Sequence, residues 1–253
     1  MKISVITAAY NSAATIADTL RSVNEQTHSD VEHIIVDGLS TDDTVAVVQE
    51  HGTRVSRVIT ERDRGIYDAM NKGLAAATGD VIGLLNSDDL YPHSDVLANV
   101  VAAFMAESEL DAIYGDLCYV KQFDVTRNVR YWRSSEFKPG YFLHGWVPPH
   151  PTFFARREVY ERLGTFDLNY RLAADWELLV RFMEVNRIRT RYCPHVFVHM
   201  RLGGATNRSW ANVWKQNNEI WRAAKAHGLR PSLGTFVVGK LWSRGRQFMT
   251  SSK

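Results

Sequence analysis

The sequence contains only two cysteines, Cys118 and Cys193, in 253 residues. They allow one disulfide at most, and no Cys-x-x-Cys pair is present for structural zinc or dithiol redox chemistry. No apolar run approaches the roughly 18 residues that a membrane-spanning helix needs. The N-terminus, Met1-Lys-Ile-Ser, enters an alternating segment at once and does not resemble a signal peptide. We therefore expect a cytoplasmic protein.

Two common nucleotide-binding motifs are also absent. Neither Gly-x-Gly-x-x-Gly nor Gly-x-x-x-x-Gly-Lys-Ser/Thr occurs in the sequence. The first motif holds the pyrophosphate of a dinucleotide, and the second holds the phosphates in P-loop enzymes. Their absence argues against dinucleotide oxidoreductases and P-loop phosphate enzymes.

The composition is that of a folded protein with an uneven charge distribution. Hydrophobic residues make up 45% and charged residues 23%, which excludes a largely disordered chain. Residues 207–253 carry nine Lys or Arg against one acid, Glu219, whereas residues 1–206 carry more acids than bases. This basic segment predicts a region that binds anions, with a solvated helix face as the alternative.

Residues 230–253 interleave apolar side chains with Lys240, Arg244 and Arg246. As a helix, this segment would lie in a membrane interface with its bases on anionic headgroups. Packing on the body or self-association is the alternative. We expect no nucleic-acid partner, because no aromatic-basic platform or groove-reading motif accompanies the charge.

The first 114 residues alternate strand and helix patterns. Strands are expected at 3–7, 33–37, 55–60 and 81–85, and helices at 12–26, 41–49, 66–77 and 96–106. Ser40 or Thr41 is the expected N-cap of the second helix. This alternation is typical of βαβ units and predicts an α/β fold with a mostly parallel sheet.

After Tyr114 the pattern becomes mixed. A hairpin or sheet edge is expected at 117–120 and 129–132, a loop at 138–151, strands at 152–155 and 189–200, and helices at 156–163, 174–185 and 207–226. Trp210, Trp214 and Trp221 recur at helical spacing and are predicted to be core. We expect one domain over 1–206, whose halves 1–115 and 116–206 share a core, followed by a basic helical extension at 207–253.

Four polar segments follow the predicted strands of the first half. In open α/β sheets, ligands bind beyond the carboxyl ends of the strands, so four polar segments at one edge predict a ligand crevice. Each segment alone is a weak signal, since an Asp-Gly turn is usually only a turn. The Asp37 carboxylate can accept a hydrogen bond from a base N–H, which favours a nucleotide. The segments are Thr7-Ala8-Ala9-Tyr10-Asn11, Asp37-Gly38-Leu39-Ser40-Thr41-Asp42-Asp43, Asp63-Arg64-Gly65 and Asn86-Ser87-Asp88-Asp89.

The acidic pair in the fourth segment has a metal-binding and a structural interpretation. Carboxylates at a strand end suit a hard divalent cation, Mg²⁺ or Mn²⁺, that bridges to a diphosphate. The alternative is an Asx turn or helix N-cap for the segment that begins near Pro92.

These segments resemble the family-2 inverting glycosyltransferases, which have the GT-A fold. The resemblance covers about residues 3–115 strongly and 145–204 more loosely. Residues 4–11 are similar to the family's opening strand and nucleotide loop, and residues 37–44 to its uracil- and ribose-binding turn. Residues 63–73 are similar to an element of a branch that builds bacterial surface polysaccharides and glycolipids. The resemblance implies a GT-A-like, Rossmann-type, mostly parallel central sheet flanked by helices, with a nucleotide-sugar half at 1–115, a mixed-sheet acceptor half at 116–206 and C-terminal helices.

The resemblance also implies roles for single residues. The fourth segment falls where the family carries its Asp-x-Asp metal motif, with Asn86 in place of the first Asp. Asp88 is then the principal metal ligand, Asn86 a partner of ribose or of a metal-bound water, and His199 a second candidate for metal or diphosphate. The donor-binding residues implied in this way are Thr7, Ala8, Tyr10, Asn11, Asp37, Gly38, Ser40, Asp63, Arg64, Gly65, Lys72, Asn86, Ser87 and Asp88.

The second half supplies the candidate base. Residues 171–178 resemble the family's Glu-Asp motif, with Ala174 where the Glu often stands and Asp175 at the base position. Inversion at an anomeric carbon needs a carboxylate opposite the leaving diphosphate, which takes the proton of the acceptor hydroxyl. The alternative for Asp175 is a helix N-cap, and Glu177 points elsewhere and is predicted to be structural.

Candidates on the acceptor side are Trp146, His150 and Asp89. His150 lies in a Pro-rich loop that would border the acceptor, and a structural histidine is the alternative.

We therefore predict a metal-dependent, hexosyltransferase-type inverting glycosyltransferase. It would move a sugar from a nucleoside diphosphate, with UDP preferred, to a hydroxyl of a lipid-linked or growing glycan. A polyprenyl-linked acceptor would place it at the inner face of the cell membrane. The rival predictions are a nucleotidyltransferase, which usually has a basic Gly-rich first loop, and a non-catalytic nucleotide-sugar binder, suggested by Asn86 and Ala174.

Overall fold

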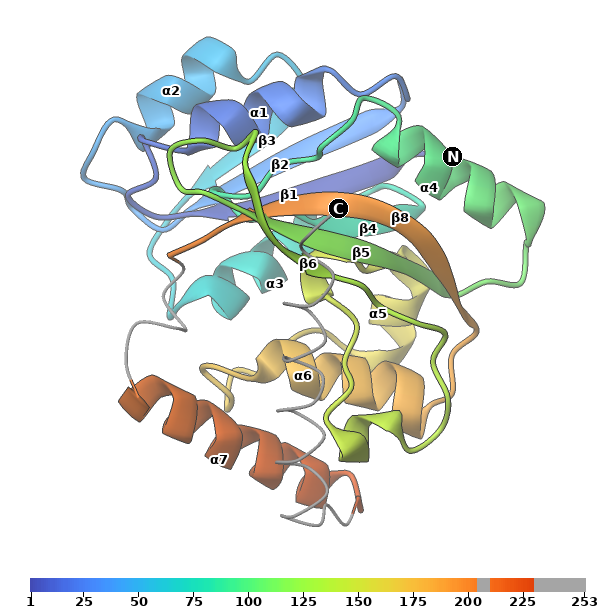
Figure 1. The fold of residues 1–253 in the computed structure, drawn as a ribbon. Coiled ribbons are helices and arrows are strands. Elements are labelled where there is room, and N and C mark those ends of the chain that lie inside the picture. Colours follow the sequence, from blue (N-terminus) through green and yellow to red (C-terminus); the bar gives the residue numbers. More distant parts are fainter. Residues whose placement is uncertain (204–209, 230–253) are drawn as a thin grey trace.

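In the computed structural model, an eight-stranded sheet lies between two layers of helices (Figure 1). The structure describes residues 1–203 and 210–229. The strands are β1 (Ile3–Ala9), β2 (Val31–Asp37), β3 (Val55–Thr60), β4 (Val81–Leu84), β5 (Ala112–Val120), β6 (Asn128–Trp132), β7 (Phe154–Arg156) and β8 (Thr190–Arg201). The helices are α1 (Ile16–Asn24), α2 (Thr44–His51), α3 (Ile66–Ala76), α4 (Val96–Ala106), α5 (Arg157–Leu163), α6 (Ala174–Leu179) and α7 (Trp210–Ala226). Two 3-10 turns, η1 (Tyr141–His144) and η2 (His150–Thr152), and a π-helical turn, η3 (Val180–Val185), complete the elements.

The sheet has a parallel half and a mixed half. The strand order is β3-β2-β1-β4-β7-β5-β6, and β8 pairs with β5. Strands β1 to β4 are parallel, β7 is antiparallel to both β4 and β5, β6 is antiparallel to β5, and β8 runs parallel to β5. The predicted α/β class, with a parallel first half and a hairpin beginning the second, is therefore confirmed.

Strand β1 is buried on both faces because helices cover both faces of the sheet. Ile6 and Ala8 pack into the core on the α3 side, and Ile3 and Val5 pack into the core that includes α4. Helix α3 can lie close to β1 because Gly73 has no side chain. A Cβ at this position would come within 2.3 Å of Ile6 Cγ2. This close contact fixes the position of α3 under the parallel strands.

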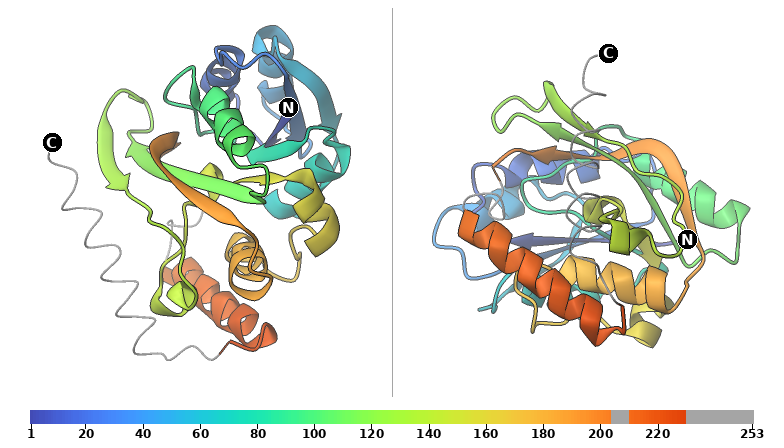
Figure 2. Two further views of the ribbon diagram at one scale, coloured as in Figure 1. Left: turned by 90° about the vertical axis from the view of Figure 1, so that its right-hand side faces the viewer. Right: turned by 60° about the horizontal axis from the view of Figure 1, so that its bottom comes forward.

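Helix α7 packs against α6, on the side of α6 away from the sheet (Figures 1 and 2). Ile220, Ala223 and Ala224 of α7 are buried in the same large core as α6 and α3. Trp214 is 70% exposed, so its predicted core position is wrong, and Trp221 is half-buried. The side chain of Trp210 lies outside the described residues, as does the predicted membrane segment 230–253.

Two helices begin later than predicted. Helix α1 starts at Ile16 instead of residue 12, and α2 starts at Thr44 instead of Thr41. The expected N-cap at Ser40 or Thr41 is wrong, because the Ser40 hydroxyl bonds Asp37 and the Thr41 hydroxyl bonds Asn11. None of the helices in the described parts of the chain combines the length and the apolar character that crossing a membrane requires.

His33 in β2 predicts an acid-sensitive fold. Its side chain is fully buried, and burial lowers the pKa of the imidazole from 6.5 to about 3. The unfolded chain binds a proton near pH 6.5, whereas the folded chain binds it only near pH 3, so stability falls as the pH drops below 6.5. We expect His33 to remove roughly 1.4 kcal/mol of unfolding free energy for each pH unit in this window. Urea unfolding at pH 7.5 and 5.5 measures the loss, and His33→Leu should lack this share of it. An equal pH dependence in His33→Leu would contradict the assignment.

Candidate functional site

The loops after β1 and β2 are held together by short polar side chains. The Asn11 N–H donates to Ser40 Oγ at 2.9 Å, and the Thr41 N–H donates to Asn11 Oδ1 at 2.9 Å. Asn11 has a φ of 49°, a left-handed conformation that asparagine tolerates better than most residues. The Ser12 N–H adds a bond to Thr44 Oγ1 at 2.7 Å. Two of the four predicted ligand loops therefore form one unit.

The loops after β3 and β4 join this unit. A Cβ at Gly38 would lie 2.3 Å from Asp63 Oδ2, so the absence of a side chain at Gly38 leaves room for the Asp63 carboxylate beside the second loop. The Ser12 and Ser87 hydroxyls are 2.8 Å apart, and Thr15 Oγ1 donates to the Ser87 carbonyl at 2.9 Å. The structure thus brings together the four segments that the sequence predicted at one sheet edge.

Not every predicted donor-binding side chain faces outward. Thr7 is fully buried and its hydroxyl lies 3.0 Å from His33 Nε2, so its side chain is directed into the fold. Ala8 is buried within β1 as well. Asp37 is 1% exposed, and its carboxylate accepts bonds from the N–H and hydroxyl of Ser40. Tyr10, by contrast, is 62% exposed beyond the end of β1.

The two predicted cations of the third element have different surroundings. Arg64 is exposed and pairs with Asp68 at 3.2 Å, and this hydrogen bond lowers the pKa of Asp68. Lys72 donates to the Arg62 carbonyl at 2.6 Å and pairs with Glu61 at 3.1 Å. The Arg64 guanidinium is therefore exposed at the third loop, whereas the Lys72 ammonium is bonded to the segment before that loop.

Of the two neighbouring carboxylates after β4, Asp88 is half-buried and Asp89 is buried. Burial raises the pKa of Asp88, and the charge of Arg201 offsets part of that rise. Asp89 is fully buried, and burial together with the charge of Asp88 raises its pKa well above the usual range. Asn86 Nδ2 donates to Asp89 Oδ2 at 2.9 Å, and the Arg201 N–H donates to Asp89 Oδ1 at 3.3 Å. This burial corrects the expected acceptor-side position of Asp89, which instead supports the loop from within.

Arg201 is a site residue that sequence reasoning missed. It ends β8, is 6% exposed, and pairs with Asp18 of α1. Its charge acts on both Asp88 and Asp89. The only signal in the sequence was a basic residue at the end of a predicted strand.

His199 lies on the same strand and has a different neighbour. Its backbone pairs with Leu90, which follows Asp89, but burial and the neighbouring His93 lower its pKa. Arg201, and not His199, is the charged group that acts on Asp88. The expected role of His199 as a second metal ligand stays a prediction. Within residues 1–203 and 210–229, no group of three or more His, Cys, Asp or Glu side chains could hold a metal ion.

Asp175 reaches the parallel half of the molecule through Tyr67. It is the second residue of α6, and Tyr67 Oη of α3 donates to its Oδ1 at 3.0 Å. The Trp176 N–H donates to the same oxygen at 2.8 Å. Asp175 also raises the pKa of His150, although burial lowers it more. The candidate base and one acceptor-side candidate therefore lie close to the start of α3, directly after the third loop.

Helix α6 is anchored by residues outside its own segment. Glu219 of α7 accepts the Leu172 and Ala173 N–H groups at 2.7 and 3.0 Å, so Glu219 caps α6 and the N-cap alternative for Asp175 is wrong. Glu177 is 3% exposed and bonds Arg181 at 2.9 Å and His227 at 2.7 Å. The structural role predicted for Glu177 is confirmed.

Trp146 is at the centre of an aromatic cluster. Its ring lies 5.5–6.0 Å from those of Tyr114, Phe137, Tyr141 and Phe142. It is half-buried, so part of the indole remains open on the loop that the sequence placed at the acceptor side.

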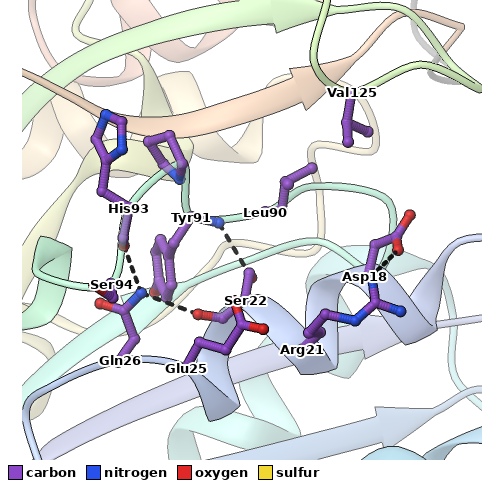
Figure 3. Close-up of a pocket in the computed structure, with 11 residues that line it drawn as sticks. Asp18, Arg21, Ser22, Glu25, Gln26, Leu90, Tyr91, His93, Ser94 and Val125 are labelled. Carbon is purple, nitrogen blue, oxygen red and sulfur yellow. Dashed lines mark hydrogen bonds and ion pairs between the residues drawn. The ribbon is translucent and has the colours of Figure 1, made fainter.

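A cavity of about 230 Å³ lies away from these loops, between α1 and residues 90–94 (Figure 3). Asp18 and Arg21 of α1 and Glu25, which follows the helix, line it, and none of the predicted site residues does. Bonds from the Tyr91 N–H to Ser22 Oγ and from Gln26 Nε2 to the His93 carbonyl hold its two walls together. We interpret it as a gap in the packing of α1, separate from the loop crevice.

Comparisons with known proteins agree with this geometry. The family model described as Glycosyl transferase family 2 matches residues 4–164. A PGL/p-HBAD biosynthesis glycosyltransferase of Mycobacterium bovis is 34% identical in an alignment of 210 residues that covers 81% of this chain and 78% of the relative.

Two solved structures cover nearly the whole chain. Residues 1–349 of S. aureus TarS in complex with UDP-GlcNAc match with a TM-score of 0.68 and 17% identity, over 100% of this chain and 82% of that one. A mannosyltransferase from Pyrobaculum calidifontis, in complex with GDP-Man and Mn²⁺, matches with a TM-score of 0.65 and 23% identity, over 99% of this chain and 70% of that one. The chain therefore has the GT-A fold, belongs to glycosyl transferase family 2 and is a glycosyltransferase.

Proposed function

We propose that the protein is an inverting glycosyltransferase that transfers a sugar from a UDP-sugar to a hydroxyl of a lipid-linked or growing glycan. The observation that carries this proposal is the hydrogen bond between Tyr67 and Asp175. It holds a carboxylate of the second half beside the helix that follows the third donor loop. A base from one half and a donor crevice from the other are then parts of a single site.

The joined loops supply the donor site in this proposal. Tyr10 is the exposed aromatic ring at the crevice, and a nucleobase can stack on it. Each oxygen of the buried Asp37 carboxylate has capacity for a further hydrogen bond, so Asp37 remains our candidate for a base N–H. The bound UDP-GlcNAc of TarS and GDP-Man of the mannosyltransferase support a nucleoside diphosphate sugar as the donor.

Asp88 fits the divalent cation, Mg²⁺ or Mn²⁺, that we propose. Mg²⁺ is commonly held by one or two carboxylates together with substrate phosphates, so a dedicated protein cage is not required. Asp88 is half-buried beside the fully buried Asp89, with Arg201 as the counter-charge that acts on both. That excess of negative charge suits a cation. When bound, the cation would stabilise the charge that develops on the leaving diphosphate.

In the transfer step, Asp175 accepts the proton of the acceptor hydroxyl as that oxygen attacks the anomeric carbon. The bond from the anomeric carbon to the diphosphate breaks on the opposite face, which inverts the configuration. Arg64 is exposed at the third loop, and we assign it to the diphosphate. His150 and Trp146 border the acceptor in this proposal.

A glycolipid acceptor at the inner face of the cell membrane is the proposed setting. The relative from Mycobacterium bovis is named for PGL/p-HBAD biosynthesis, which supports an acceptor with a lipid portion. The basic segment 230–253 lies outside the described residues, and its composition alone supports contact with anionic lipid.

Two variants separate the base from the metal ligand. Asp175→Asn keeps the side-chain shape but removes the proton acceptor, so we expect UDP binding to persist and transfer to fall by about 10²–10⁴. Asp88→Ala should instead abolish both turnover and the Mn²⁺ dependence of UDP binding. Release of free nucleoside diphosphate from UDP-glucose, UDP-galactose, UDP-GlcNAc and GDP-mannose measures turnover, and calorimetry with UDP measures binding.

The same assay contains the outcomes that contradict the proposal. Release of sugar 1-phosphate instead of nucleoside diphosphate would indicate a nucleotidyltransferase, and binding without turnover would indicate a sugar-nucleotide binder. Wild-type turnover of Asp175→Asn would remove Asp175 from the base position.

Asn86→Asp tests the charge balance after β4. The substitution removes the amide that donates to Asp89 and adds a third carboxylate beside Asp88. Without divalent cation, we expect the unfolding free energy at pH 7.5 to fall by about 2–4 kcal/mol. Mn²⁺ should raise the melting temperature more in this variant than in the wild type. Asn99→Asp, the same change on the exposed face of α4, should alter stability by less than about 0.5 kcal/mol. Wild-type stability of Asn86→Asp in EDTA would contradict this account.

The basic segment is tested by flotation of the full chain with vesicles. We expect binding to vesicles that contain phosphatidylglycerol at low salt, because each basic residue near an anionic surface contributes on the order of 1 kcal/mol. Replacing Lys240, Arg244 and Arg246 together by Glu should abolish flotation, and neutral phosphatidylcholine vesicles are the control. Equal flotation of both proteins would exclude the segment as the membrane contact.

A further inference from the structure

The hydrogen bonds of Asp175 fall on one of its two oxygens. Tyr67 Oη and the Trp176 N–H both donate to Oδ1, at 3.0 and 2.8 Å. No hydrogen bond reaches Oδ2 from the described residues. Two donors on one oxygen fix the plane of a carboxylate, and the other oxygen keeps its lone pairs for a proton. Asp175 Oδ1 is therefore the oxygen that orients the carboxylate, and Oδ2 is the oxygen available to a substrate.

Tyr67 is suited to this contact because its hydroxyl remains a donor. Burial and the charge of Asp175 raise the pKa of the phenol well above its usual value. The phenol thus keeps its proton at any pH at which a carboxylate base operates. The Tyr67 hydroxyl donates to the carboxylate and does not compete with it for the proton of a substrate.

The ring of Tyr67 is itself held in place. It stacks on Phe166 with centroids 5.3 Å apart and an interplanar angle of 27°. The backbone of Phe166 is clamped by Asn71, which accepts the Phe166 N–H at 2.9 Å and donates to the Phe166 carbonyl at 2.9 Å. Tyr67 and Asn71 are one turn apart on α3, so one helix fixes both the phenol and the surface on which it rests.

The first turn of α3 is also tied to the third donor loop. The Arg64 N–H donates to Asp68 Oδ2 at 3.0 Å, and the Asp68 N–H donates to the Gly65 carbonyl at 2.9 Å. Tyr67 lies between these two bonded positions. The loop that faces the donor and the side chain that holds the base are therefore parts of one continuous element.

We propose that Tyr67 is a positioning residue that orients the Asp175 carboxylate so that its free Oδ2 meets the acceptor hydroxyl. The role rests on the proposed function of Asp175 as the base. Through α3, Tyr67 also sets the position of this carboxylate relative to the donor loop. A misplaced base slows transfer without weakening donor binding, because the nucleotide contacts remain intact.

A double-mutant cycle separates this role from simple packing. The proteins are the wild type, Tyr67→Phe, Asp175→Asn and the double variant, assayed with the sugar nucleotide of the four above that gives turnover. Phenylalanine keeps the stacking on Phe166 and removes only the hydroxyl. We expect Tyr67→Phe to lower kcat by on the order of 10-fold, with the KM for the donor and the Kd for UDP unchanged within about twofold. In the Asp175→Asn background, the same substitution should change kcat by less than about twofold.

A matched control is available elsewhere in the fold. Tyr131 Oη donates to the buried carboxylate of Asp116 at 2.6 Å. Tyr131→Phe removes the same kind of bond from a carboxylate without a proposed catalytic role. It should leave kcat unchanged, which shows that loss of a tyrosine–carboxylate bond does not by itself impair turnover.

The outcomes that overturn the proposal are distinct from those that overturn the function. The positioning role is wrong if Tyr67→Phe keeps wild-type kcat, lowers kcat equally in both backgrounds, or raises the Kd for UDP in step with the loss of kcat. Should Tyr67→Phe fail to fold, Phe166→Leu removes the platform of the ring and must reproduce the loss of kcat at unchanged UDP affinity. Wild-type kcat in Asp175→Asn, or no turnover of any donor, refutes the function itself.

Discussion

The close contact between α3 and β1 fixes the geometry on which both halves of the site depend. Because Gly73 has no side chain, α3 settles against Ile6 of the central strand. The start of the helix then lies at the third donor loop, while Tyr67 and Asn71 face the second half. The third donor loop and the residue that contacts the candidate base are thus both positioned by the packing of α3 on β1. A shift of α3 would move the third donor loop and Tyr67 together, because both belong to this element.

Electrostatics at the end of β4 follow from the burial of Asp89. A buried carboxylate needs hydrogen bonds or a counter-charge, and Asp89 has the amide of Asn86 and the backbone and charge of Arg201. The neutral amide at position 86 is then favourable, since an acid there would add repulsion to Asp88 and Asp89. Asp89 takes up the bonds that the loop offers, and Asp88 remains as the carboxylate at the surface of the pair. The departure from Asp-x-Asp therefore has a local physical cause.

Sequence patterns predicted the elements of the fold well because most of them depend on local periodicity. All strands of the parallel half were expected within two residues of their observed ends, and the four polar loops were expected at one edge. The starts of α1 and α2 were wrong because Ser12, Thr15 and Thr41 are used for bonds between loops, which no single segment reveals. Partnerships between distant residues were likewise not predictable. Arg201 beside the β4 carboxylates, Tyr67 on Asp175 and the exposure of Trp214 all follow from how the two halves pack.

The cap that Glu219 places on α6 has a consequence for the order in which the protein becomes competent during synthesis. Asp175 is translated well before Glu219, yet the N–H groups of Leu172 and Ala173, at the start of its helix, are bonded only once α7 has folded back. A nascent chain that ends near residue 206 already carries the donor loops and the base carboxylate. It lacks the residue that secures the helix beneath that carboxylate. The contact between Glu219 and the segment before α6 joins residues far apart in the sequence, so its formation costs more chain entropy and is slower than formation of the local βαβ units. The donor half can therefore assemble on the ribosome first, and the segment before α6 gains its two bonds to Glu219 only when α7 is in place.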